Sequence, residues 1–147
     1  VSLSSDGSIV AIGALGNDGN GTSSGHVRVY KNVSGTWTKV GSDIDGEAAY
    51  DQSGYSVSLI NDGSIVAIAA RYNDGGGADA GHVRIHQNVS GTWTQVGSDI
   101  DGEASNDWSG FSVSLSSDGS IVAIGAIKND GNGSSSGHVR VISLGGL

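Results

Sequence analysis

Cysteine, proline and methionine are all absent from the 147-residue sequence. Without cysteine, disulfide bonds and thiolate metal sites are excluded, so packing and backbone pairing must hold the fold together. Without methionine, even at the first position, we expect a processed product or a piece of a longer protein. No apolar run reaches the roughly 18 residues of a membrane-spanning helix and no signal segment is recognisable, so we expect no membrane span.

Basic residues are scarce as well. The 7 lysines and arginines accompany 15 aspartates and glutamates, which gives a formal net charge of −8. A nucleic-acid-binding surface concentrates positive charge, so we expect no nucleic-acid partner. An acidic surface is compatible with divalent cations, with solubility in salt and with a glycan-coated exterior.

Glycine, in contrast, is abundant, and its turns recur with a period. The 26 glycines stand among many serines, asparagines and aspartates, which indicates frequent turns. Val-Ser-Leu begins at Val1, Val57 and Val113, 56 residues apart, and the motifs Asp-Gly-Ser-Ile-Val-Ala-Ile and Gly-His-Val-Arg recur at the same spacing. We therefore predict three repeat units, the third truncated. They span residues 1–56, 57–112 and 113–147.

Each full unit is predicted to form four short strands. In the second unit Tyr55, Val57 and Leu59 alternate with serines, which indicates a half-buried strand, and an Asp-Gly turn follows. The next run is apolar on both faces and must lie between two other layers. The predicted strands are 55–60, 65–70, 82–86 and 92–96, and residues 97–110 are predicted to link to the next unit. No segment shows a helical period.

A repeating unit of four antiparallel strands, one of them buried on both faces, is typical of β-propeller blades. The predicted fold is therefore all-β, with four-stranded antiparallel blades repeating every 56 residues. A propeller ring usually needs about four to eight blades, so this chain is predicted to form an incomplete propeller. Its exposed blade edges are expected to contact further repeats or other chains, including copies assembled head to tail.

Three motifs of the second unit resemble FG-GAP repeats, which build integrin-α-like β-propellers. They are Ser-Gly-Tyr-Ser-Val-Ser-Leu (53–59), Val-Ala-Ile-Ala-Ala (66–70) and Gly-His-Val-Arg-Ile (81–85). The segment from Thr-Trp-Thr-Gln-Val to Asp-Gly-Glu-Ala is similar to the bacterial and algal branch of that family. The resemblance implies a propeller that mediates extracellular contacts. Short turns replace the family's calcium loop here, so we expect no calcium at that family position.

Acidic residues elsewhere are candidate calcium ligands, and calcium is the one cofactor that the sequence suggests. Asp43, Asp45, Glu47 and Asp51 stand around a glycine with the spacing of oxygen ligands for Ca²⁺. The next unit repeats the set as Asp99, Asp101, Glu103 and Asp107. In the alternative interpretation, these carboxylates cap turns or accept hydrogen bonds from backbone amides in the connectors between blades.

Two further sets of residues are candidates for contact with carbohydrate. The Asn-x-Ser/Thr sequons, which are candidate glycosylation sites, are Asn20, Asn32, Asn88 and Asn132. The repeated Trp37 and Trp93 could stack on sugars, the alternative being core packing on the fourth strand.

Histidine and arginine also recur, two residues apart and so on one face of a strand, where we expect a solvated or inter-blade surface. The few residues that break the repeat could tune a contact surface. They include Arg71, Tyr72 and Trp108.

Three functions compete at this point. Symmetric repeats, acidity and sequons favour a non-catalytic structural or adhesive module, located outside the cell or on its surface. The alternative is a lectin-like propeller that binds glycans. An enzyme built on a larger propeller is the third, but a catalytic site normally breaks repeat symmetry, and neither a Ser-His-Asp set nor a carboxylate pair stands out from the repeat.

Overall fold

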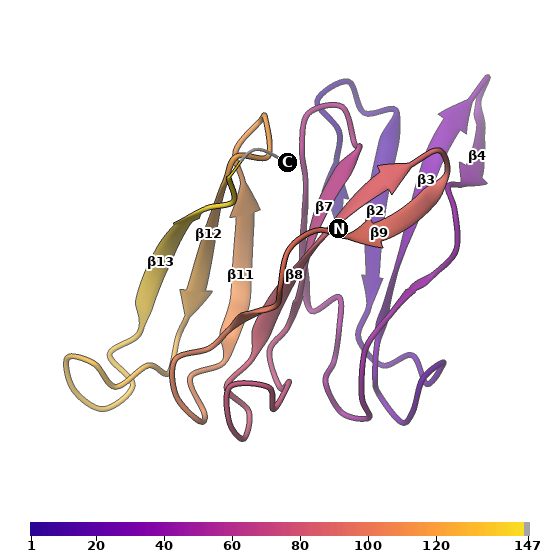
Figure 1. Cartoon of the computed structure of the whole chain (residues 1–147). Coiled ribbons are helices and arrows are strands. Elements are labelled where there is room, and N and C mark those ends of the chain that lie inside the picture. Colours follow the sequence, from indigo (N-terminus) through magenta and orange to yellow (C-terminus); the bar gives the residue numbers. More distant parts are fainter. Residues whose placement is uncertain (146–147) are drawn as a thin grey trace.

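The computed structural model describes residues 1–145, in which all regular structure is β-strand. Three antiparallel sheets stand side by side, from the first at the right of Figure 1 to the third at the left. This arrangement confirms the predicted all-β fold of incomplete propeller blades. No helix with the length and apolarity to cross a bilayer occurs in this part of the chain.

We call the sheets the first, second and third blade. The first contains β1 (Ser2–Leu3), β2 (Ile9–Ala14), β3 (His26–Val33), β4 (Thr36–Lys39) and β5 (Ile44–Asp45). The second contains β6 (Ser56–Leu59), β7 (Ile65–Ala70), β8 (His82–Val89), β9 (Thr92–Gln95) and β10 (Ile100–Asp101). The third contains β11 (Ser109–Leu115), β12 (Ile121–Ala126) and β13 (His138–Ser143). The last two residues of the predicted third unit lie outside the described residues.

The first two blades each contain one short strand more than the sequence predicted. The segment 97–110, predicted as a link, includes β10, which pairs with the start of β8. β9 pairs only with the C-terminal half of β8, so the N-terminal half is free to pair with β10. In the first blade β5 pairs with β3 in the same way. A strand of two residues has no alternation for a sequence pattern to detect, which is why these strands were missed.

The middle strand β7 is buried along its whole length, as its apolar sequence predicted. On one face Val66 and Ile68 pack in a cluster with Val29 of the first blade. Residues on the other face join Val122 and Ile124 of the third blade in a second cluster. The two hydrophobic cores therefore lie between the blades, and each blade depends on its neighbour for burial.

Serines of the edge strands β1 and β6 connect successive blades. The amide of Leu59 donates to Oγ of Ser2, at 2.9 Å, and the amide of Leu115 donates to Oγ of Ser58, at 3.0 Å. These amides lie on the edge strands β6 and β11, where a sheet leaves backbone donors unpaired. The alternation of serine with apolar residues in Val-Ser-Leu thus supplies one inter-blade hydrogen bond per boundary.

Glycine permits the closest approach of the second and third blades. Gly81 has a φ of +77°, and a Cβ there would overlap the carbonyl oxygen of Ser109 and lie 2.7 Å from its amide nitrogen. Gly25 is placed in the same way against Ser53 at the boundary of the first two blades. The Gly-His motif of the repeat therefore has a steric cause.

We expect Gly81→Ala to lower the free energy of unfolding by about 3 kcal/mol or more, because it combines a positive φ with overlap of the next backbone. Gly97 is a matched control: its φ is +73° and a Cβ there would meet nothing within 4 Å. Gly97→Ala should cost only about 1 kcal/mol. Urea denaturation followed by tryptophan fluorescence measures both losses, and equal losses would contradict a close approach at Gly81.

Candidate functional site

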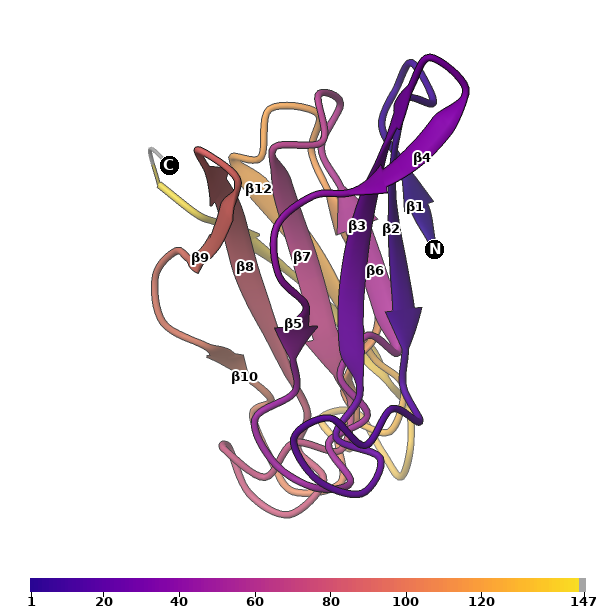
Figure 2. The ribbon, with the colours of Figure 1, turned by 90° about the vertical axis from the view of Figure 1, so that its right-hand side faces the viewer.

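The outer face of the first blade exposes apolar residues that other blades bury. We define this first outer face by Val10, Ile12, Tyr30 and Trp37, which line a shallow hollow of about 360 Å³. Ile12 is 38% exposed, whereas its repeat equivalents Ile68 and Ile124 are 0% and 1% exposed. The difference arises because the equivalents face a preceding blade. Figure 2 shows the first blade in front, with this face toward the viewer.

The third blade presents the opposite half of the same interface. We define this third outer face by Ile121, Val139 and Val141. Val139 and Val141 are 68% and 69% exposed, and their equivalents Val83 and Ile85 in the second blade are 0% and 2% exposed. The two outer faces are therefore the complementary halves of the blade-to-blade contact. This contact occurs twice in the chain, between the first and second blades and between the second and third.

An arginine adds a polar contact to each internal boundary. Nη2 of Arg84 donates to the carbonyl oxygen of Asp45 in the first blade, at 2.7 Å. Nη2 of Arg140 donates to the carbonyl oxygen of Asp101 in the second blade, at 2.6 Å. These arginines thus face the preceding blade, which confirms that this strand face is an inter-blade surface.

Arg28, the first member of this series, pairs within its own blade instead. Its guanidinium donates through Nε and Nη2 to the two oxygens of Asp43, at 3.0 and 2.9 Å, and Lys39 binds the same carboxylate. Hydrogen bonds from Arg28 and then Lys39 hold the pKa of Asp43 well below its ordinary value. Arg28 is 43% exposed, so its side chain lies at the surface of the first outer face.

A polar cluster lies at the boundary of the first two blades. Nδ1 of His82 is 3.8 Å from Oε2 of Glu47 in the first blade and 3.7 Å from Oδ2 of Asp99 in the second. Burial lowers the pKa of His82 to about 4, with Arg84 acting in the same direction and Asp99 against it. Burial also raises the pKa of Glu47, with Arg84 opposing this shift and nearby carboxylates reinforcing it. The imidazole is therefore neutral at pH 7.

The first set of candidate calcium ligands does not converge on one point. Asp43 is paired with two cations, and Asp45 is exposed and 4.0 Å from Nδ1 of His26. Glu47 turns instead to the second blade. Asp51 is buried, where its Oδ2 accepts hydrogen bonds from the amide of Ala48 and from Nδ2 of Asn73. The sequence grouped these residues as ligands of one ion, whereas in the structure Glu47 and Asp51 contact the second blade and Asp43 pairs within the first.

The second set is divided in the same way. Asp99 faces His82, and Asp101 offers its backbone carbonyl to the third blade. Glu103 lies 3.6 Å from Nδ1 of His138. Asp107 is buried and accepts hydrogen bonds from Ala104 and Asn129, just as Asp51 does with its own partners. The buried members, Asp51 and Asp107, thus make the turn contacts of the alternative interpretation.

The two repeated tryptophans have different surroundings. Nε1 of Trp93 donates to the carbonyl oxygen of Val40 in the first blade, at 2.8 Å, and its ring packs against the core between the blades. Trp37 is 46% exposed on the first outer face. The same side chain is thus an inter-blade contact in the second blade and open surface in the first, because the second blade packs against a preceding blade and the first does not.

Residues that break the repeat meet at one end of the blades. The Arg71 guanidinium carbon lies 3.9 Å from the ring centroid of Tyr55, 4.4 Å from that of Tyr72 and 5.3 Å from that of Trp108. Nζ of Lys128 lies 3.4 Å from the Trp108 ring centroid. Trp108 has a φ of +56°, a costly conformation for a bulky residue. The sequence showed that these residues differ from the repeat, but not that they form one cation–aromatic patch.

Asn20 and Asn132 lie in loops, whereas Asn32 and Asn88 lie near the ends of the strands β3 and β8, next to hairpin turns. Nδ2 of Asn20, the atom to which a glycan would be attached, donates to the carbonyl oxygens of Gly46 and Glu47. Asn32 and Asn88 use their oxygens instead, each accepting a hydrogen bond from the amide three residues later in its hairpin. Asn132 lies in an exposed loop. A glycan on Asn20 would therefore displace two contacts between loops.

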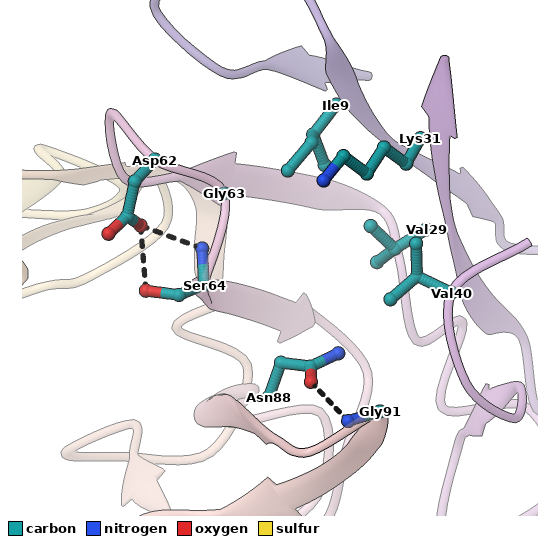
Figure 3. Close-up of a pocket in the computed structure, with 9 residues that line it drawn as sticks. All are labelled: Ile9, Val29, Lys31, Val40, Asp62, Gly63, Ser64, Asn88 and Gly91. Carbon is teal, nitrogen blue, oxygen red and sulfur yellow. Dashed lines mark hydrogen bonds between the residues drawn. The ribbon is translucent and has the colours of Figure 1, made fainter. Parts of the chain in front are cut away.

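A hollow of about 290 Å³ separates the ends of the first two blades (Figure 3). Ile9, Val29 and Val40 form its apolar wall. The polar groups opposite bond within their own turns: Asp62 accepts hydrogen bonds from Ser64, and Asn88 accepts one from Gly91. The hollow therefore offers mainly apolar surface.

The blades, the inter-blade cores and the two open faces together define an open fragment of β-propeller architecture. Residues 93–142 match the model of the FG-GAP repeat family, which confirms the resemblance over this part of the chain. A search of curated protein sequences found no match.

Among solved structures, hydrazine synthase from Kuenenia stuttgartiensis is similar, with a TM-score of 0.56 and 14% sequence identity. The match covers 98% of this chain and 32% of that chain. At this identity the likeness shows the fold alone.

The contrast between the tryptophans can be measured. We expect Trp93→Ala to lower the free energy of unfolding by about 3 kcal/mol, because it opens the inter-blade core and removes a hydrogen bond. Trp37→Ala should cost less than about 1.5 kcal/mol, because its ring is already half exposed. Urea denaturation followed by circular dichroism compares the two variants. Equal losses would show that the blades do not pack through Trp93.

Proposed function

We propose that this chain is a non-catalytic extracellular repeat module, with a structural or adhesive role, whose outer blade faces bind further blades of the same repeat. One observation carries this proposal: Val139 and Val141 are exposed, whereas the residues at the equivalent positions of the second blade are buried. Burying a valine side chain contributes about 1.5 kcal/mol or more. A next blade would therefore be stabilised by the interaction that joins the first three.

The polar groups at the blade boundaries also support the binding of a further blade. A preceding blade that bound the first outer face would bring a backbone carbonyl toward Arg28, as Asp45 does for Arg84. Arg28 would then exchange its exposed pairing with Asp43 for this contact. The arginine and serine contacts recur at each boundary. A further blade of the same sequence would therefore offer the matching groups to either outer face.

The remaining parts of the proposal rest on composition and family. Acidity, exposed sequons such as Asn132 and the FG-GAP match are consistent with a secreted or cell-surface module. The repeat equivalents Asp51 and Asp107 have equivalent structural roles, which suits a scaffold better than a catalytic site.

Carbohydrate binding is the second candidate function. The observation that favours it is the exposed ring of Trp37 beside the apolar hollow of the first outer face. Aromatic rings in such a setting can stack on sugars. Trp93 does not offer the same platform, because its ring packs against the first blade, so any sugar site would be a property of the first outer face and not of each blade.

The proposal predicts that the chain associates head to tail. Sedimentation velocity over a concentration series should show association of the unchanged chain. Val141→Lys should abolish it, because the variant places an ammonium group in an apolar contact where that charge has no partner.

Val89→Lys is the matched control, since Val89 is 55% exposed on the middle blade and lies on neither outer face. This variant should associate like the unchanged chain. A monomer at all concentrations, or equal effects of the two substitutions, would refute the proposed contact.

A further inference from the structure

The polar cluster between the first two blades has the composition of a metal site. One ligand atom each from His82, Glu47 and Asp99 lies within 4.8 Å of the others. Glu47 belongs to the first blade's connector and the other two to the second blade, so the set exists only where two blades meet. Neither carboxylate is buried: the side chains of Glu47 and Asp99 are 42% and 32% exposed.

The histidine shows that the cluster lacks a partner for one of its buried atoms. His82 is 1% exposed, and its Nδ1 has no hydrogen-bond partner among residues 1–145. Its distances to the two carboxylates, 3.7 and 3.8 Å, are too long for hydrogen bonds. A buried polar atom without a partner costs about 1–3 kcal/mol. A cation between the three groups would satisfy all of them.

We propose that a divalent transition-metal ion of the Zn²⁺ type binds between the first and second blades, with His82, Glu47 and Asp99 as its ligands. Bonds from such an ion to imidazole nitrogen and carboxylate oxygen are about 2.0–2.2 Å long. Because Glu47 and Asp99 are partly exposed, their side chains can close on the ion while the buried His82 stays in place.

The ligand set selects the class of metal. Calcium takes oxygen ligands, whereas imidazole suits Zn²⁺ and neighbouring transition metals. Imidazole binds a metal through an unprotonated ring nitrogen, and Nδ1 of His82, which has no hydrogen-bond partner among residues 1–145, faces both carboxylates. Arg84 lies 3.4 Å from the other oxygen of Glu47, Oε1, and so orients Oε2 toward His82. Its single positive charge is outweighed by the two carboxylates.

The equivalent groups of histidine and carboxylates elsewhere in the chain offer fewer free ligands. At the second boundary His138 faces Glu103, and no second carboxylate joins them among residues 1–145. In the first blade His26 lies near Asp43 and Asp45, but Arg28 and Lys39 already hold Asp43. We therefore expect one strong site in this chain, and one further site for each complete boundary in a longer array.

Calorimetric titration of the whole chain with Zn²⁺ should show one equivalent bound, and Co²⁺ should give visible absorption bands of low coordination number. Glu47→Gln and Asp99→Asn should each weaken binding at least about tenfold. Both residues are partly exposed, so these variants should fold, which circular dichroism can verify. Zn²⁺ should raise the melting temperature of the unchanged chain and not that of Glu47→Gln.

Glu103→Gln is the matched control, because it removes the corresponding carboxylate from the incomplete second boundary. It should bind Zn²⁺ like the unchanged chain. Absence of binding, equal affinity in the Glu47→Gln and Asp99→Asn variants, or equal displacement by Ca²⁺ would overturn the proposed site. The outcome does not depend on whether the chain self-associates, so this test and that of the outer faces can fail separately.

Discussion

Burial of both faces of the middle strand is the constraint on which the rest of this structure depends. β7 is apolar on each side, and a single sheet can cover neither face by itself. The first blade covers Val66 and Ile68, and the third covers the opposite face. Stability is therefore shared between neighbouring blades, as in other repeat proteins, and any blade at an end has one face that is not covered.

Polar contacts set the register of this apolar stacking. Each boundary has a serine that accepts from a leucine amide, an arginine that donates to an aspartate carbonyl, and a glycine that admits the next backbone. These contacts satisfy groups that burial would otherwise leave unpaired. The proposed metal site belongs to the same series, since it joins Glu47 of one blade to His82 and Asp99 of the next.

The repeat made much of the fold predictable. The apolar run of β7, the Asp-Gly turns and the absence of helices from residues 1–145 followed from alternation and turn chemistry. β5 and β10 could not be predicted, because they are two residues long and form only where β3 and β8 offer a free edge. The candidate metal site could be predicted less well from the sequence. Loop spacing grouped Glu47 with Asp51, yet Glu47 faces the next blade and Asp51 is buried in a turn.

The sequence by itself determined the period, the strand type and the chemical character of each face, since these depend on local alternation and on glycine at positive φ. Only the tertiary structure decided which repeated residues are equivalent in environment. Trp37 and Trp93 lie in the same motif, but one is half exposed and the other packs against a preceding blade. The reason is physical: burial and hydrogen bonding depend on the neighbouring blade, which lies about one whole repeat away in the chain.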